Sequence, residues 1–299
     1  FQKKVQFKNF KLAVIDEQHK FGVVQRQSLE RKGKLNTIIM SATPIPRSLA
    51  LTVHGDKDLT VLYQKPKDRP SIETLIMQSN KIDNLLIKIK RDLDLGFQAY
   101  WICPLVEQSE KTDLSNSMDR FDYLKQALIN VNVGLIHGKM SPEEKENELA
   151  KFNEGITEVL VSTTVIEVGI DNPNAVSIVI ECANRFGLSQ LHQLRGRVGR
   201  GKEKSYCFLI YDLPISENAI ERLKIMKGTN DGFQIAEKDL YLRGSGDFFG
   251  TMQSGDEIFR LAHLKENKSL QEQAISLFME LESKKKISSE KFYQLRRFL

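Results

Sequence analysis

Short apolar runs alternate with longer amphipathic stretches along most of this 299-residue chain. The runs are rich in Val and Ile, which favours strands that are covered on both faces of a sheet. Such runs, separated by helical stretches, are typical of an α/β fold with a mostly parallel sheet. We predict strands at Leu12–Ile15, Thr37–Met40, Thr74–Met77, Ala99–Ile102, Val133–Ile136, Val159–Val161, Val176–Ile180 and Tyr206–Ile210.

The same pattern divides the chain into three parts. The segment QKPKDRPS, residues 64–71, places two prolines among charged residues and predicts a linker. Residues 1–66 hold only two strands, which are too few for an independent α/β domain. Residues 67–213 hold six strands, enough for a complete one. Over residues 214–299 the strand pattern stops and helical periodicity takes over.

One helix start is strongly marked, in MSPEEKENELAKFNEG. Ser141 can cap the helix, Pro142 suits its first turn, and Glu144 completes a capping box. Gly155 is placed to end the helix. We therefore predict a helix between Ser141 and Gly155.

Composition narrows the class of protein only a little. Hydrophobic residues make up 40% and charged residues 28%, as in ordinary globular proteins, and the net charge of +5 is compatible with nucleic acid without establishing it. Cys103, Cys182 and Cys207 lie far apart in apolar runs, which predicts buried free thiols and a cytoplasmic setting. The sequence has no apolar run of about 20 residues and no signal-peptide pattern. It starts without Met, so we expect it to begin partway into a longer protein.

The first cluster of candidate chemistry is AVIDEQHKFGVVQR, in which Asp16 and Glu17 follow a predicted strand. An acid at the carboxyl end of a parallel strand lies where α/β sheets bind ligands. An Asp there can hold Mg²⁺, and an adjacent Glu can orient and deprotonate an attacking water. Taken alone, a polar turn at the end of a strand explains the pair equally well.

Two further strand ends carry hydroxyl groups. In IIMSATPIPRSLA, Ser41 and Thr43 follow a strand, which is common loop chemistry when it stands alone. In VLVSTTVIEVGIDNPNA, hydroxyls and backbone N–H groups suit phosphate oxygens, and Gly169 permits close approach of the backbone. A connection between two strands with polar caps is the alternative. The candidates of this second segment are Thr164, Glu167, Gly169 and Asp171.

The segment QLHQLRGRVGRG carries three arginines, Arg195, Arg197 and Arg200. If it is helical, Gln193, Arg197 and Arg200 fall on one face and can present guanidinium groups to a triphosphate. An arginine finger is worth about 10³–10⁵ in rate. A basic helix that touches nucleic acid is the alternative.

The overlapping stretch GRVGRGKE nearly matches a phosphate-binding loop. It ends in Glu203 where that loop has a hydroxyl residue, and it precedes a strand instead of following one. We find no genuine phosphate-binding loop in the 299 residues.

In their order along the chain, DEQH, SAT, STTVIEVGID and QLRGRVGR resemble the motifs of a superfamily 2 helicase or translocase. Within that superfamily, DEQHKFGVVQR and SATPIPRSLA are similar to the bacterial RecG family of branched-DNA translocases. The stretch NDGFQIAEKDLYLRGSGDFFGTMQSG resembles a motif that RecG shares with the transcription-repair coupling factor Mfd. In that motif a helical hairpin and a loop convert motor movement into translocation. Mfd is the close alternative, but its acidic motif usually differs from DEQH.

The resemblance implies an architecture of RecA-like motor domains, each a parallel sheet flanked by helices. Residues 1–66 would be the carboxy-terminal remnant of the first, and residues 67–213 the complete second. Residues 214–299 would form the helical hairpin, the translocation loop and carboxy-terminal helices. The family's wedge domain, adenine-recognition segment and Lys-bearing phosphate loop have no counterpart in the 299 residues. We therefore expect this chain alone not to hydrolyse ATP.

The resemblance also implies roles at the matching positions. The catalytic residues would be Asp16, which coordinates Mg²⁺, Glu17 as the base, and Arg197 and Arg200 at the γ-phosphate. Residues for nucleotide binding and coupling would be Gln18, His19, Ser41, Thr43, Gly169, Asp171 and Gln193. Residues for DNA contact and translocation would be Thr164, Glu167, Arg222, Arg243 and Gln253.

Three positions depart from the family. Ser245 stands where the family commonly has Pro, Asp247 where Glu is usual, and Met252 where a basic residue is frequent. We expect a more flexible translocation loop with altered DNA contacts.

The cycle that the resemblance implies uses ATP and Mg²⁺ in the cleft between the two motor domains, which closes about a hinge near residues 64–71. Its substrate would be branched double-stranded DNA, at stalled forks and Holliday junctions, in recombination and repair. The same resemblance implies a monomer, a single-strand-binding protein as a partner, no membrane, and a cytoplasmic, nucleoid-associated location. A non-catalytic nucleic-acid-binding fragment remains the alternative from another class.

Overall fold

The computed structural model describes residues 11–16, 36–41, 60, 62, 70–104, 110–163, 172–243, 273 and 277. The chain divides into two compact units, Phe1–Ile45 and Pro46–Leu299. Most of the predicted linker at residues 64–71 lies outside the described residues, as do the three positions that depart from the family. Each unit is described by itself.

The described part of the first unit is a pair of parallel strands, β1 (Leu12–Ile15) and β2 (Asn36–Ile39). Their register runs from Leu12 opposite Asn36 to Ile15 opposite Ile39, and the Met40 amide donates to the Ile15 carbonyl oxygen at 2.7 Å. Both strands predicted in this part of the sequence are confirmed.

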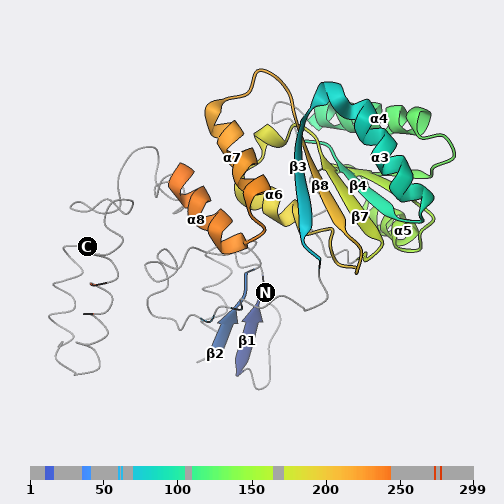
Figure 1. Ribbon diagram of the computed structural model, residues 1–299. Coiled ribbons are helices and arrows are strands. Elements are labelled where there is room, and N and C mark those ends of the chain that lie inside the picture. The colour runs from blue at the N-terminus through green and yellow to red at the C-terminus, as the bar shows by residue number, and fades with distance from the viewer. Residues whose placement is uncertain are drawn as a thin grey trace. The chain divides into compact units, whose positions relative to one another are not determined.

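The second unit contains a parallel six-stranded sheet in the order β3-β8-β7-β4-β6-β5 (Figure 1). All six strands predicted here are confirmed to within two residues at each end. They are β3 (Ile72–Gln78), β4 (Gln98–Ile102), β5 (Val133–Ile136), β6 (Val159–Ser162), β7 (Ala175–Ile180) and β8 (Ser205–Tyr211).

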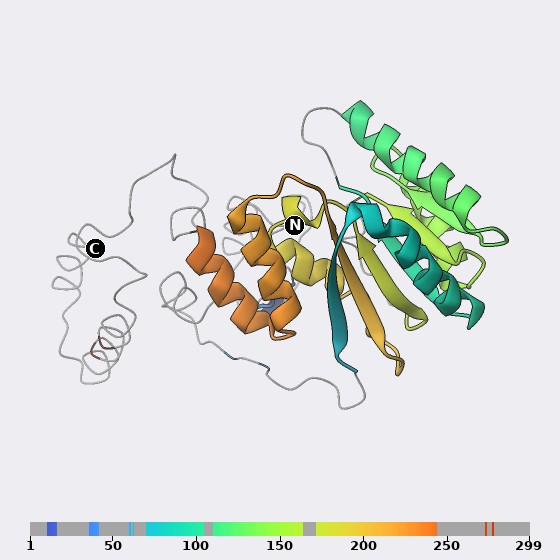
Figure 2. The same cartoon turned by 45° about the horizontal axis from the view of Figure 1, so that its top comes forward.

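Helices cover both faces of this sheet, as the predicted class requires (Figures 1 and 2). One face packs against α3 (Ile82–Asp94) and α4 (Glu110–Ala127). The other packs against α5 (Pro142–Asn153), α6 (Leu188–Arg195) and α7 (Glu217–Gly228). The short 3₁₀ turns η2 (Ser79–Lys81) and η3 (Ala183–Arg185) follow β3 and β7.

Alternation along β4 shows how the sequence builds these two layers. Successive side chains of a strand point to opposite faces. Trp101 therefore joins the core under α3 and α4, whereas Tyr100 and Ile102 join the core under α5 to α7. Every residue of β4, β6 and β7 is buried. The Val- and Ile-rich composition of these strands thus reflects cover on both faces.

The start of α5 has the predicted capping box. The Glu144 amide donates to the Ser141 hydroxyl at 3.2 Å, and the Ser141 amide donates to the Glu144 carboxylate at 2.7 Å. After the helix, Gly155 adopts a φ of 79°, a conformation that favours glycine. The predicted helix and both of its end signals are confirmed.

The last described helices belong to the same packed unit as the sheet. Leu223 and Met226 of α7 and Ile235 of α8 (Gly232–Arg243) lie in one core cluster with Leu188 and Leu191 of α6. The first two helices of the predicted third segment therefore share a core with the sheet. None of the helices that the structure describes is long and apolar enough to cross a membrane.

The three cysteines are free thiols, as predicted. Cys103 and Cys207 are buried, but Cys182 is only half-buried, so the prediction that all three are buried is wrong for Cys182. Cys182 follows the end of β7 at the edge of the sheet, with a φ of 47°. Cys182 is the second residue after β7, so it lies outside the strand whose residues are all buried.

Candidate nucleotide and nucleic-acid site

In the first unit, Asp16 and Ser41 lie at the carboxyl ends of neighbouring strands. Asp16 directly follows β1 and Ser41 follows β2 by two residues, and both are exposed. Because the strands are parallel and in register, both side chains leave the same edge. The structure thus brings these two predicted residues to one end of the strand pair. The other candidates of this unit, Glu17, Gln18, His19 and Thr43, lie outside the described residues.

The exposed Asp16 carboxylate suits a Mg²⁺ ion that arrives with a nucleotide. Such an ion usually takes one or two carboxylates and completes its shell with phosphate oxygens and water. Among the described residues no group of three or more His, Cys, Asp or Glu side chains could hold a metal by itself.

In the second unit, only the first half of the arginine segment is helical. Helix α6 ends at Arg195 with Gly196 as its C-cap. The chain then turns, with the Arg197 amide on the Leu194 carbonyl oxygen at 3.0 Å, until Gly199 adopts a φ of +75°. The prediction that Gln193, Arg197 and Arg200 share one helical face is therefore wrong. The physical reason is the glycine pair, since glycine costs helix stability and Gly199 has a left-handed backbone.

We call residues 196–201 the arginine turn, and two glycines hold it against the sheet. A Cβ atom on Gly199 would lie 2.8 Å from Cγ1 of Ile72, and one on Gly201 would lie 2.5 Å from the carbonyl oxygen of Pro173. Ile72 begins β3, and Pro173 precedes β7 by two residues. The arginine turn therefore lies at the amino-terminal edge of the sheet.

The residues that flank the predicted hydroxyl-bearing segment lie at the two edges of the sheet. Thr163 is buried at the carboxyl end of β6, where the Ser162 hydroxyl donates to its carbonyl oxygen at 2.6 Å. Asn172 is buried near the start of β7 and donates to the Gln98 side-chain oxygen at 3.1 Å. Since β6 and β7 both run parallel to β4, Thr163 and Asn172 lie at opposite edges.

Between these two residues, the candidates Thr164, Glu167, Gly169 and Asp171 lie outside the described residues. The segment nevertheless emerges at Pro173, against Gly201 of the arginine turn. The structure therefore brings the end of this predicted motif next to the predicted arginines.

Sequence reasoning missed the structural role of Arg195. This side chain is only 2% exposed, and its guanidinium group donates to the carbonyl oxygens of Met226 at 2.7 Å and Thr229 at 2.9 Å. Burial lowers its pKa from the ordinary value of arginine. The signal in the sequence was its position, because Arg195 lies four residues after Leu191 and so shares the apolar face of α6.

Of the three predicted polar anchors of the translocation element, the structure describes two, Arg222 and Arg243. Arg222 of α7 donates from Nη2 to the Asn184 carbonyl oxygen at 2.8 Å, which ties α7 to η3. Arg243 is the last residue of α8. Gln253, the third predicted anchor, lies outside the described residues.

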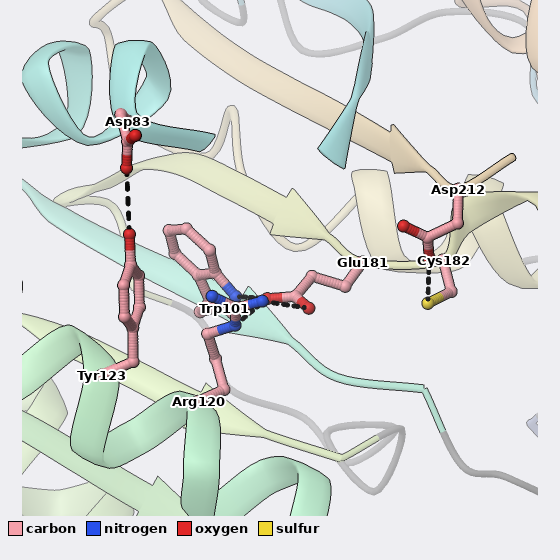
Figure 3. Close-up of polar contacts among 7 residues, drawn as sticks. All are labelled: Asp83, Trp101, Arg120, Tyr123, Glu181, Cys182 and Asp212. Carbon is pink, nitrogen blue, oxygen red and sulfur yellow. Dashed lines mark hydrogen bonds and ion pairs between the residues drawn. The ribbon is translucent and has the colours of Figure 1, made fainter. Parts of the chain in front are cut away.

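The carboxyl edge of the sheet carries a polar cluster, drawn in Figure 3. Glu181, directly after β7, accepts a hydrogen bond from the Trp101 indole. It also pairs with Arg120 of α4, through Nε at 2.6 Å and Nη2 at 3.1 Å. The Arg120 guanidinium carbon lies 5.0 Å from the Tyr123 ring centroid, and the Tyr123 hydroxyl donates to Asp83 at 3.1 Å. These contacts fix α4 to the ends of β4 and β7.

Replacing Arg120 by Met should destabilise the second unit by about 1–3 kcal/mol, because it leaves the largely buried Glu181 carboxylate without its cation. Urea unfolding of the 299-residue chain, followed by fluorescence, would measure this, since Trp101 is the single tryptophan. The matched control is Lys90→Met, which breaks the exposed Lys90–Asp94 pair and should cost under about 0.5 kcal/mol. Equal costs for the two variants would contradict the structural weight given to the Arg120–Glu181 pair.

At the same edge, Cys182 donates from its thiol to the Asp212 carboxylate at 3.1 Å (Figure 3). Burial, followed by the hydrogen bond and charge of Asp212, raises the pKa of Cys182 from 9.0 to about 12. Hydrogen bonds from Ser79 and Cys182 lower the pKa of Asp212. The Cys182 thiol is therefore protonated at neutral pH.

Iodoacetamide at pH 8 should thus alkylate Cys182 about 10³-fold more slowly than in the urea-unfolded chain, since only the thiolate reacts. Asp212→Asn should speed the reaction, because it removes the negative charge that accepts from the Cys182 thiol. Asp83 accepts from Tyr123 instead, so Asp83→Asn should leave the rate unchanged. Peptide mass spectrometry would follow the reaction. A rate for Asp212→Asn equal to that of the unaltered chain would be the contrary result.

Comparison with known proteins shows which families and solved structures this fold is similar to. The family described as "Helicase conserved C-terminal domain" matches residues 80–202, from η2 to the end of the arginine turn. The family "ATP-dependent DNA helicase RecG, domain 3, C-terminal" matches residues 229–275, which include α8. Among solved structures, RecG bound to a three-way DNA junction has a TM-score of 0.68 at 40% identity, covering 90% of this chain and 34% of that chain. Yeast Dbp5 bound to RNA and ADP BeF3 shares the fold alone, with a TM-score of 0.55 at 15% identity.

Two curated relatives give the same result. The ATP-dependent DNA helicase RecG of Bacillus subtilis (strain 168) is 49% identical over 265 residues, which are 88% of this chain and 39% of that protein. RecG of Staphylococcus epidermidis (strain RP62A) is 45% identical over 300 residues, which are 100% of this chain and 44% of that protein. The chain thus spans about two fifths of the length of the curated relatives that it matches.

The six-stranded sheet with its helices is therefore a RecA-like helicase carboxy-terminal domain. Within that class, the chain is homologous to the RecG helicases along most of its length.

Proposed function

We propose that this chain forms the second motor domain, and part of the first, of an ATP-driven translocase that acts on branched DNA. The observation that carries the proposal is the arginine turn, which glycines hold beside Pro173 in a chain that is 45–49% identical to RecG. The substrates would be stalled forks and Holliday junctions, which the motor would reverse or migrate.

Residues from each unit would have their own part in nucleotide chemistry. Helicases of this class use ATP, and bound Mg²⁺ would neutralise phosphate charge. Asp16 would hold that ion, and Glu17 would orient and deprotonate the attacking water. Arg197 and Arg200 would stabilise the charge that develops on the γ-phosphate, with Gln193 and Asp171 contacting the nucleotide. Whether the bound nucleotide is intact or hydrolysed would be signalled to the DNA-binding residues by Gln18, His19, Ser41 and Thr43.

DNA would be bound at the carboxyl edge of the sheet and by the helical tail, residues 214–299. Thr164 and Glu167 follow β6, whose carboxyl end carries the buried Thr163. Arg222 holds α7 to η3, so the start of the tail is fixed to the motor. Arg243 and Gln253 would anchor the loop that engages duplex DNA. We also expect a monomer that works at the nucleoid with a single-strand-binding protein.

The test is ATP hydrolysis by the complete gene product, since the 299 residues contain no phosphate-binding loop. A three-way DNA junction should stimulate turnover more than a linear duplex of the same base composition, because the substrate is a branch point. Absence of ATP hydrolysis with and without DNA would overturn the proposal in favour of a non-catalytic nucleic-acid-binding role. Equal stimulation by the two DNAs would overturn the assignment of branched substrates.

A further inference from the structure

We propose that Arg195 and Asn230 are positioning residues that make the arginine turn and the start of α8 a single rigid body. A shift of the arginine turn on nucleotide binding would then displace α8 directly. The inference rests on the proposed function, because it assigns the contacts through which the motor would drive its helical tail.

The first contact is the cap that Arg195 places on α7. Its Nη1 donates to the carbonyl oxygens of Met226 and Thr229, at the carboxyl end of that helix, and lies 3.3 Å from the Thr74 hydroxyl in β3. The last carbonyls of a helix have no intrahelical partner and carry its negative dipole end. A guanidinium group satisfies both needs at once. Arg195 immediately precedes Gly196, so the residue that caps α7 also begins the arginine turn.

The partners of Arg195 favour a geometric role over a stabilising one. In the described part of the chain, its hydrogen-bonding partners are two carbonyls, one hydroxyl and Nδ1 of His192 at 3.2 Å, and none is a carboxylate. Burial of this cation without a carboxylate partner carries a desolvation penalty, which offsets part of what its hydrogen bonds contribute to stability. What it does supply is direction, because its Nη1 binds β3 and the end of α7 while its Nη2 lies 3.2 Å from Nδ1 of His192 in α6.

The second contact runs through Ile72. The Asn230 side-chain amide donates to the Ile72 carbonyl oxygen at 3.0 Å. The side chain of Ile72 is what packs under Gly199, with Cγ1 2.8 Å from the position of a Cβ atom there. One residue thus touches the arginine turn with its side chain and the α7–α8 link with its backbone.

The α7–α8 link in turn fixes where α8 begins. Next to Asn230, the Asp231 carboxylate accepts from the Phe233 amide at 2.8 Å, and the Asp231 carbonyl accepts from the Ile235 amide at 3.1 Å. Asp231 therefore caps α8, and Asn230 holds that cap against β3. Arg195 thus joins the start of the arginine turn to the end of α7, and Ile72 joins the arginine turn to the α7–α8 link.

The experiment compares ATP turnover with junction unwinding in the complete gene product. Asn230→Ala should leave DNA-stimulated ATP turnover unchanged and lower the unwinding achieved per ATP several-fold, because it removes the hydrogen bond from the α7–α8 link to Ile72. Arg195→Met should reduce the same ratio, and Arg195→Lys should restore only part of it, because a single ammonium nitrogen cannot bind Met226, Thr229 and His192 together. Arg120→Met is the control, since it should lower the melting temperature and leave the ratio unchanged.

A ratio that stays at the wild-type value in Asn230→Ala and Arg195→Met, with only the melting temperature lowered, would overturn the inference. Hydrogen exchange of the 299-residue chain separates this from failure of the proposed function. Arg195→Met should raise exchange in the arginine turn and in the first turn of α8 together. Exchange that rises in one of them only would also overturn the inference, whatever the ATP turnover of the wild-type protein.

Discussion

Replacing Arg200 by Ala in the complete gene product is expected to lower DNA-stimulated ATP hydrolysis by about 10³-fold or more. The reason is that a guanidinium group stabilises the charge that spreads over the transferred γ-phosphate, and Ala removes that group. Gly199 and Gly201 flank Arg200 and press the turn against Ile72 and Pro173. The backbone that carries this side chain is therefore held in one position, as a catalytic arginine requires.

Binding of a DNA junction by Arg200→Ala should remain close to wild type, because the residue faces the nucleotide in the proposed function. Turnover is measured by phosphate release and binding by electrophoretic mobility of a labelled three-way junction. The matched control is Arg91→Ala, which removes an exposed arginine of α3 that has no proposed role and should leave both values unchanged. A loss of binding as large as the loss of turnover would assign Arg200 to DNA instead of ATP.

Most of the fold could be predicted from the sequence because the strands are buried on both faces. A strand such as β7, AVSIVI, must be apolar along its whole length, and the capping box of α5 is a local signal that needs no tertiary information. Patterns of this kind survive in the sequence because each depends on neighbours within a few positions. The eight strands and the helix after Ser141 were therefore predicted correctly.

The candidate site was harder to predict because its geometry depends on residues distant in sequence. The arginine segment has helical spacing, but Gly196 and Gly199 end the helix, and contacts with Ile72 and Pro173 decide where the turn lies. The general rule that ligands bind at the carboxyl ends of parallel strands led to Asp16. It does not apply to Arg197 and Arg200, because α6 returns the chain to the amino-terminal edge before the turn begins.

The role of Arg195 could also not be predicted from the sequence. As a charged residue in a basic motif it indicates a ligand contact, yet its partners are Met226 and Thr229, more than thirty positions away. Charge alone could not distinguish a buried cap from an exposed finger. The packing of α7 onto α6 makes that distinction, and it lies beyond any local pattern.

Replacing Gly201 by Ala is expected to have the second largest effect, although it adds a single methyl group. That Cβ atom would lie 2.5 Å from the carbonyl oxygen of Pro173, a separation that real Cβ atoms essentially never show. The obstacle is backbone, so no side-chain rotation relieves it, and either the turn or the start of β7 must shift. We expect a loss of about 1–3 kcal/mol in unfolding free energy, measured by urea titration of the 299-residue chain.

The same shift should carry Arg200 away from its position, and a displacement of about 1 Å is enough to lower ATP turnover of the complete gene product by about 10²-fold. Gly228→Ala is the matched control, because a Cβ atom there meets nothing within 4 Å. Since Gly228 is the last residue of α7, Ala should be neutral or stabilise the helix by up to about 1 kcal/mol. Normal turnover and stability in Gly201→Ala would mean that the turn can move away from Pro173 freely, and the argument that it holds Arg200 in place would fail with it.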